Sequence, residues 1–255
     1  MKDVLEFLGT GAADWSMNDR GPFFRRNSAA LLNGAVMIDC GPHIWDYTIS
    51  TYGRSVYQGV HMLLVTHPHG DHFCRESVAR LADGRRLSVL GDEATVRLAC
   101  SIEGVDAVPA PLFEETVTQG YTCIPVPANH APDQESFQAR HYIITTPNGG
   151  TVFYGLDGAW FENAAWHEMC RHRYDIMVLD CTVGDKADWR LFEHNTIPML
   201  RIMAEGIMEK GLLKEGGRIY ASHLARTLHA SYAVTEELLS DFGVLLAYDG
   251  LTIIF

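Results

Sequence analysis

Four residues that can bind a metal ion fall within the segment 67–72, which reads His-Pro-His-Gly-Asp-His. Imidazole and carboxylate groups are ligands of Zn, Mn and Fe in proteins. The segment follows the apolar run Met62–Val65 and precedes a helical pattern, so we predict a strand-to-helix turn that directs alternate side chains toward one point. Its proline stiffens the turn and its glycine allows close backbone approach. The alternative is a histidine-rich surface loop in which Asp71 caps a helix, and four such groups at this spacing argue against it.

A metal site needs further ligands, and three residues share the position that would supply them. His130, Asp157 and His223 each close an apolar run of strand length, where side chains emerge at a sheet edge. Alone, each is more often a turn former, a helix cap or a histidine satisfied by a hydrogen bond. Their recurrence at three strand ends, together with the segment 67–72, favours a shared site. Asp180 also ends a strand and competes with Asp157 for a place in it.

Apolar runs of strand length, several of them rich in Val and Ile and bounded by Gly, Pro or Asp, recur along the chain. They predict strands at Val4–Leu8, Ala29–Leu32, Val36–Ile38, Met62–Val65, Tyr121–Val126, Tyr142–Thr145, Val152–Tyr154, Ile176–Leu179, Ile219–Ala221, Val244–Ala247 and Leu251–Ile254. The turns Pro147–Gly150 and Tyr248–Gly250 contain Asn-Gly and Asp-Gly pairs, which tolerate positive φ, and we expect both to close hairpins.

Helical periodicity appears between the later strands. It predicts helices at Phe73–Leu81, Glu93–Ile102, Phe161–Cys170, Asn195–Met208 and Thr235–Phe242. The early part of the chain is rich in hairpins, and later strands alternate with helices. This mixture predicts an α+β architecture of two packed mixed sheets with helices outside. No internal repeat or linker interrupts it, so we expect one domain over residues 1–255.

The composition excludes some partners and indicates a compartment. The chain has 255 residues, of which 47% are hydrophobic and 20% charged, as in globular proteins with a sizeable core. A net charge of −12 makes long nucleic acids and anionic membranes poor partners.

Six cysteines without C-x-x-C spacing suit reduced thiols. The first residues lack the apolar core of a signal peptide, and no apolar stretch is long enough to span a bilayer. We therefore expect a cytoplasmic protein.

The order of these motifs resembles the metallo-β-lactamase superfamily. An H-x-H-x-D-H segment is followed by a single histidine, a single aspartate and a late histidine. Within the superfamily, the chain is most similar to the phosphodiesterase branch, which includes the accessory phosphodiesterase of phosphonate breakdown and the tRNA 3′-processing nucleases. The segments that match this branch are Leu8–Gly11, Asn27–Ser28, Ile38–Gly41, Asn129–His130, Asp180–Thr182, Phe192–Thr196 and Ser222–His223.

The resemblance implies an αββα sandwich and a ligand set for two divalent metal ions, Zn or Mn or alternatively Fe. His67, His69 and His130 would hold one ion. Asp71, His72 and His223 would hold the second, and Asp157 would bridge both because it lies between the two single histidines, as in the family.

The resemblance also implies roles for residues around the metal ions. Asp71 would take part in catalysis as well as in metal binding. Asp39 would orient a ligand histidine, a task that metal sites usually assign to a carboxylate. His194 would be the catalytic histidine that contacts the scissile phosphate or protonates the leaving oxygen.

These residues predict a dinuclear phosphodiesterase that acts on a small or cyclic phosphodiester, because two metal ions can share a water and neutralise a phosphate ester. Two alternatives remain open: a metal-dependent lactone or thioester hydrolase, and a metal-binding sensor module without turnover. The loops 12–26 and 132–138 are expected to line the substrate pocket, and whether His43 borders it is left open. A homodimer is compatible with the sequence.

Overall fold

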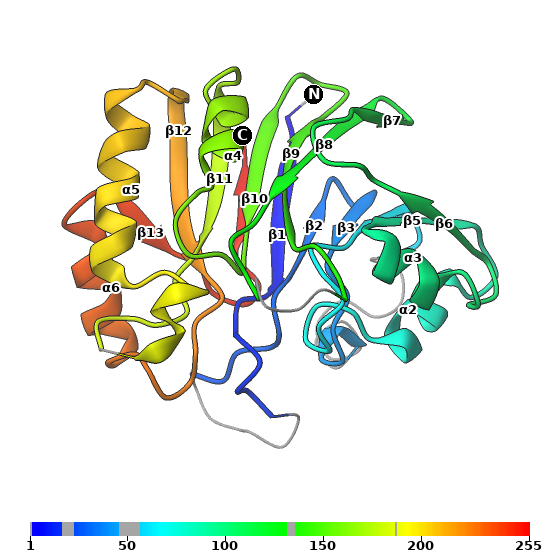
Figure 1. Cartoon of the computed structure of the whole chain (residues 1–255), viewed down its shortest axis with the longest axis horizontal. Helices are drawn as coiled ribbons and strands as arrows, with labels where there is room; N and C mark the ends of the chain where they lie inside the picture. The colour runs from blue at the N-terminus through cyan, green and yellow to red at the C-terminus, as the bar shows by residue number, and fades with distance from the viewer. Residues whose placement is uncertain (1, 17–22, 46–56, 132–135, 187) are drawn as a thin grey trace.

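Two seven-stranded sheets pack face to face in the computed structural model of the chain (Figure 1). The structure describes residues 2–16, 23–45, 57–131, 136–186 and 188–255. The loops predicted to line the substrate pocket are therefore described only in part. Among the described residues, no helix combines the length and the apolar content needed to cross a membrane.

The strand order of the first sheet is β14-β1-β2-β3-β4-β5-β6, and that of the second is β13-β12-β11-β10-β9-β8-β7. The first sheet consists of Val4–Gly9 (β1), Ala29–Leu32 (β2), Val36–Ile38 (β3), Met62–Leu64 (β4), Leu87–Gly91 (β5), Val105–Pro109 (β6) and Thr252–Ile254 (β14). The second consists of Thr116–Thr118 (β7), Tyr121–Pro127 (β8), Arg140–Thr145 (β9), Thr151–Gly155 (β10), Tyr174–Asp180 (β11), Leu213–Ser222 (β12) and Val244–Leu246 (β13).

Both sheets change from antiparallel to parallel pairing at their fourth strand. In the first sheet the change occurs at β3, which pairs antiparallel with β2 and parallel with β4. In the second sheet it occurs at β10, which pairs antiparallel with β9 and parallel with β11. Ligand sites in α/β sheets often form at the carboxyl ends of strands where the topology switches.

Helices cover the outer face of each sheet. They are Arg75–Ala82 (α2), Glu93–Ala99 (α3), Asn163–Met169 (α4), Ile197–Glu209 (α5) and Tyr232–Ser240 (α6), with a 3₁₀ turn at Trp189–Phe192 (η2). In Figure 1, α2 and α3 lie at one side of the molecule, and α5 and α6 lie at the other. Thr196 caps the N-terminus of α5, because its side chain accepts a hydrogen bond from the backbone N–H of Met199.

Side chains that point alternately to the two faces of each sheet form three layers of hydrophobic core. Leu64 and Tyr154 belong to the core between the two sheets. Their preceding residues point the other way: Leu63 packs in the core that includes α2 and α3, and Phe153 in the core that includes α4, α5 and α6. Successive strand side chains point to opposite faces, so each sheet is buried on both sides. The predicted αββα sandwich is confirmed.

Each predicted strand and helix is present, with ends that shift by a few residues. Three strands, β5, β6 and β7, were not predicted. The last two carry polar or exposed residues at most positions, so they lack the apolar run by which the other strands were identified. The prediction of a hairpin at Tyr248–Gly250 is wrong, because this turn leads from β13 in the second sheet to β14 in the first. The hairpin at Pro147–Gly150 joins β9 and β10 as expected.

Candidate metal centre

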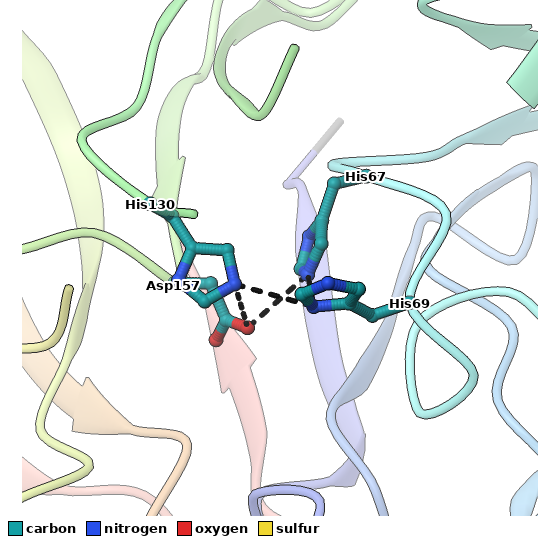
Figure 2. Close-up of side chains that lie close together, drawn as sticks. All are labelled: His67, His69, His130 and Asp157. Carbon is teal, nitrogen blue, oxygen red and sulfur yellow. Dashed lines mark hydrogen bonds and ion pairs between the residues drawn. The ribbon is translucent and has the colours of Figure 1, made fainter. Parts of the chain in front are cut away.

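All seven residues predicted as metal ligands meet at one edge of the sandwich, where strands of both sheets end. The segment 67–72 follows β4 in the first sheet. His130, Asp157 and His223 follow β8, β10 and β12 in the second sheet. Figure 2 shows His67 and His69 approaching from one side and His130 and Asp157 from the other, with their polar atoms directed at one another.

The first cluster consists of His67, His69, His130 and Asp157. The Nδ1 atom of His69 lies 2.9 Å from Nε2 of His67 and 3.2 Å from Nε2 of His130. Oδ2 of Asp157 lies 3.3 Å from Nε2 of His67 and 3.6 Å from Nε2 of His130. Three imidazole nitrogens and one carboxylate oxygen therefore converge.

The second cluster consists of Asp71, His72, His223 and again Asp157. Nε2 of His72 lies 3.2 Å from Nε2 of His223, and Oδ2 of Asp71 lies 3.3 and 3.5 Å from these two nitrogens. Asp157 contacts both histidines, with Oδ2 3.2 Å from His72 and Oδ1 2.9 Å from His223. Asp157 is thus the residue that the two clusters share.

These donor sets fit divalent cations. A neutral imidazole has one N–H donor and one acceptor nitrogen, and the rings turn their facing nitrogens toward one another in a buried space. His67, His72, His130 and His223 are all buried. Imidazole nitrogens and carboxylate oxygens are ligands of divalent metal ions in proteins, so the residues present fit the binding of such an ion.

The outer nitrogen of each of these four rings has an oxygen neighbour, which for Nδ1 of His223 is the Thr182 hydroxyl at 2.7 Å. Nδ1 of His72 lies 2.8 Å from Oδ2 of Asp39, and Nδ1 of His67 lies 3.1 Å from the Thr66 hydroxyl, which donates to Asp39. Nδ1 of His130 lies 3.4 Å from the Glu193 carbonyl oxygen. An N–H directed at such an oxygen leaves Nε2 as the acceptor that faces the cluster. Asp39 lies where the sequence predicted an orienting carboxylate.

The charge state differs between the two clusters. Burial lowers the pKa of His130 to about 4 and also lowers the pKa of His67 and His69, although Asp157 opposes this. Burial acts in the same direction on His223, but there the charge of Asp157 and the hydrogen bonds that His223 donates to Asp157 and Asp71 outweigh it and raise the pKa to about 10. The first cluster therefore offers neutral imidazoles, and the second is dominated by carboxylate charge.

His194 lies beside both clusters. Its ring centroid is 4.9 Å from that of His130, and its ring stacks on that of His223 at 5.7 Å and 14°. Nδ1 of His194 lies 2.9 Å from Oδ2 of Asp180. Burial lowers the pKa of His194, but the charge and hydrogen bond of Asp180 outweigh this effect, so the pKa is raised.

Asp180 and Thr182 are functional candidates whose position the sequence did not reveal. Asp180 was weighed as a bridging ligand, but the Thr182 hydroxyl donates to its Oδ2 at 2.9 Å and lies 2.7 Å from Nδ1 of His223. The other carboxylate oxygen accepts the backbone N–H groups of Thr182 and Asn195, each at 3.0 Å. Asp180 therefore supports His194 and, through Thr182, His223. The available signal was its place at the end of β11, directly beside β10.

The backbone is strained where the site is built. Asp39, Asp157 and His223 each adopt a positive φ, of 59°, 56° and 62°. Such conformations cost non-glycine residues about 1–3 kcal/mol each and cluster at functional sites.

Gly41 is required because a Cβ there would lie 2.1 Å from the Asp71 carbonyl oxygen. The segment 38–41 can therefore contact the ligand loop only with glycine at this position.

His43 belongs to neither cluster. Its Nδ1 accepts the backbone N–H of Asn27 at 2.9 Å, and its ring packs edge-on against Phe24. The side chain is buried. His43 therefore supports the loop that precedes β2 and presents no open surface for a ligand.

Comparison with solved structures identifies the fold. The chain is similar to a diphosphatase from the PhnP family, with a TM-score of 0.75, 21% identity and coverage of 100% of this chain and 98% of that one. It is similar to the metallo-β-lactamase fold protein YhfI from Bacillus subtilis, with a TM-score of 0.75, 12% identity and full coverage of both chains, 100% each. It is also similar to Zn²⁺-bound PqqB from Methylobacterium extorquens, with a TM-score of 0.73, 14% identity and coverage of 98% and 99%.

No family model and no curated protein matches the sequence. The structural similarity nevertheless extends over essentially the whole length of this chain and of each of the three compared proteins. The chain has the metallo-β-lactamase fold, as its motifs predicted.

Proposed function

We propose that this protein is a metal-dependent phosphodiesterase that acts on a small or cyclic phosphodiester. His67, His69 and His130 would hold one divalent ion, Asp71, His72 and His223 the other, and Asp157 would lie between them. When bound, two divalent ions activate a water molecule and neutralise charge on a phosphate ester. This pair of donor clusters sharing one carboxylate supports hydrolysis, since mere structural binding of a metal needs no second, adjoining cluster.

The single observation that favours a phosphodiester is the position of His194 beside both clusters, where Asp180 holds its ring. Asp180 holds its Nδ1, so Nε2 is the nitrogen available to a substrate. The raised pKa keeps the imidazole protonated further toward neutral pH than a free histidine. A protonated ring fixed beside both clusters can contact a phosphoryl oxygen and then donate its proton to the alkoxide or aryloxide that leaves.

The comparisons support a reaction at phosphorus without identifying a substrate. One of the similar structures is described as a diphosphatase and another binds Zn²⁺. The net charge of −12 favours a small substrate over a long nucleic acid, because a polyanion is repelled over its whole length.

The test is the substitution His194→Ala in the Zn- or Mn-loaded protein, with bis(p-nitrophenyl) phosphate as substrate. Loss of a general acid should lower turnover by about 10²–10⁴-fold while the metal content stays unchanged. His167→Ala is the matched control, because His167 is an exposed histidine on α4. Wild-type protein that carries metal but hydrolyses neither this diester nor a cyclic nucleotide would contradict the proposal. Equal turnover by wild type and His194→Ala would instead favour hydrolysis at a carbonyl carbon.

A further inference from the structure

A carboxylate that belongs to neither of the two ligand clusters borders the metal centre next to His194. An oxygen of Glu193, a ring nitrogen of His130 and a ring nitrogen of His194 all lie within 4.8 Å of one another. Glu193 is therefore close both to a proposed ligand of the first cluster and to the proposed general acid. Its charge also reaches a second ligand of that cluster: burial lowers the pKa of His69, and the charge of Glu193 is among those that oppose this effect.

The backbone fixes Glu193 in this place. The residue follows the 3₁₀ turn η2, and the N–H groups of Glu193 and His194 both donate to the Arg190 carbonyl oxygen, at 2.9 and 2.8 Å. In the same turn Trp189 and Phe192 are 71% and 73% exposed, whereas Glu193 is half-buried. Its carboxylate is thus held at the boundary between the metal centre and the exposed turn.

The Glu193 carboxylate lacks a direct counterion. Within the part of the chain that the structure describes, no side chain forms an ion pair or a hydrogen bond with it. Arg190, the nearest cationic residue along the chain, is already paired with Asp188, because its Nε and Nη2 lie 2.7 and 3.0 Å from the two oxygens of that carboxylate. A phosphate ester bound between the ligand clusters and His194 would therefore face a negative charge that no salt bridge compensates.

A negative charge at this position acts on phosphate esters according to their own charge. A phosphodiester carries one negative charge, whereas a phosphomonoester has a second pKa of about 6 and carries nearly two at pH 8. Two divalent ions alone would attract the more highly charged ester more strongly. Preference for a diester therefore requires an opposing charge, and specificity often comes from such a repulsive element.

We propose that Glu193 is a specificity-determining residue that excludes dianionic phosphate esters, so that the substrate carries a single negative charge on its phosphate. This assignment rests on the proposed phosphodiesterase function, because it takes the ester to bind at the metal centre beside His194. Glu193 would make the difference between a diester and a monoester at a centre whose metal ligands accept both.

Binding of methyl phosphate and dimethyl phosphate to the zinc-loaded full-length protein at pH 8 tests this selection without any hydrolysis. The two esters differ by one methyl group and by nearly one charge. Glu193→Gln removes the charge and keeps the size of the side chain, and in a calorimetric titration it should tighten methyl phosphate binding about tenfold more than dimethyl phosphate binding. Glu193→Asp keeps the charge and should leave the ratio of the two affinities close to that of the wild type.

Glu205→Gln is the matched control, because Glu205 is an exposed glutamate on α5 that belongs to no ligand cluster. This variant removes the same charge from the chain and should leave the ratio of the two affinities unchanged. An equal change in Glu193→Gln and Glu205→Gln would reflect net charge alone and would overturn the proposal.

Metal content and hydrolysis complete the test. The backbone carbonyl of Glu193, and not its side chain, faces Nδ1 of His130, so Glu193→Gln should retain as much metal as the wild type. Its kcat/KM for p-nitrophenyl phosphate should rise about tenfold relative to that for methyl p-nitrophenyl phosphate. Loss of metal from Glu193→Gln would make Glu193 a metal ligand and would overturn its role in specificity.

The outcomes separate the role of Glu193 from the proposed function. If the wild type hydrolyses diesters but Glu193→Gln leaves the ratios of affinities and of kcat/KM unchanged, the role of Glu193 is overturned and the phosphodiesterase remains. If Glu193→Gln selectively tightens methyl phosphate binding but no diester is hydrolysed, the charge selection holds and the proposed function falls. If neither the wild type nor Glu193→Gln binds either ester, the role of Glu193 is overturned.

Discussion

The two sheets place an aspartate at the same point of their topology and use it differently. Asp39 follows β3 and Asp157 follows β10, the strands at which each sheet changes from antiparallel to parallel pairing. Both residues have a positive φ, of 59° and 56°. Both carboxylates are buried. The backbones of the two halves thus deliver equivalent carboxylates to the edge where the ligands meet.

The neighbours of each aspartate determine its role. Asp39 accepts the backbone N–H and the hydroxyl of Thr66 and contacts the outer nitrogen of His72, so it faces away from the clusters. Asp157 instead contacts the inner nitrogens of four histidines. Strand topology thus fixes where each carboxylate is delivered, whereas the residues that surround it decide whether it can bind a metal ion or orients a ligand.

The largest expected effect comes from Asp157→Asn, because this residue is common to both clusters. Replacement of one carboxylate oxygen by an NH₂ group removes the negative charge that faces all four imidazoles. We expect loss of metal from both clusters and a fall in turnover of about 10³-fold, since metal stabilisation of charge is worth several kcal/mol. Metal content and hydrolysis of bis(p-nitrophenyl) phosphate are the measurements. The control is Asp175→Asn, which breaks an ion pair with Lys214 at the far end of β11. Unchanged metal content in Asp157→Asn would rule out the shared-ligand role.

Asp180→Asn should affect turnover without affecting metal binding. Asp180 ends β11, beside β10, and supports His194 and Thr182. Its loss should lower turnover about 10²-fold through His194. Both metal ions should be retained, because Asp180 lies near only the outer nitrogen of His223, with its Oδ2 3.8 Å from Nδ1. A variant that loses metal to the same extent as Asp157→Asn would show that Asp180 is a ligand instead.

Asp39→Asn should have a smaller and more local effect. Residues that orient metal-binding histidines typically contribute about 10–100-fold to metal affinity, and Asp39 contacts His72 directly. We expect weaker binding of one ion, with the ion at His67, His69 and His130 retained, measured by titration with a chromophoric chelator. Asp106→Asn, at an exposed position of β6, is the control. Equal weakening of both ions would remove the distinction between the two halves.

The ligand set could be predicted from the sequence because each ligand ends an apolar strand. Strand ends of one sheet meet at one edge, so His130, Asp157 and His223 were expected to lie near one another. The segment 67–72 reaches them from the first sheet because the two sheets pack face to face. The resemblance assigned them to two groups, and the geometry brings those same groups together. Their role as ligands stays a prediction until metal is measured.

The features that were missed depend on pairing between distant segments. Asp180 pairs in register with Ser222 across β11 and β12, which brings it beside His223, and no local pattern reveals that register. In the same way, the turn chemistry of Tyr248–Gly250 predicted a reversal of direction but not that the next strand joins the other sheet.

Elemental analysis of the purified protein is the most direct test of the proposal that this sheet edge holds two divalent metal ions. Wild-type protein, reconstituted with Zn or Mn and freed of excess metal, should contain about two ions per chain, and Asp157→Asn should contain markedly less. A wild-type protein that retains no metal after reconstitution would contradict the account.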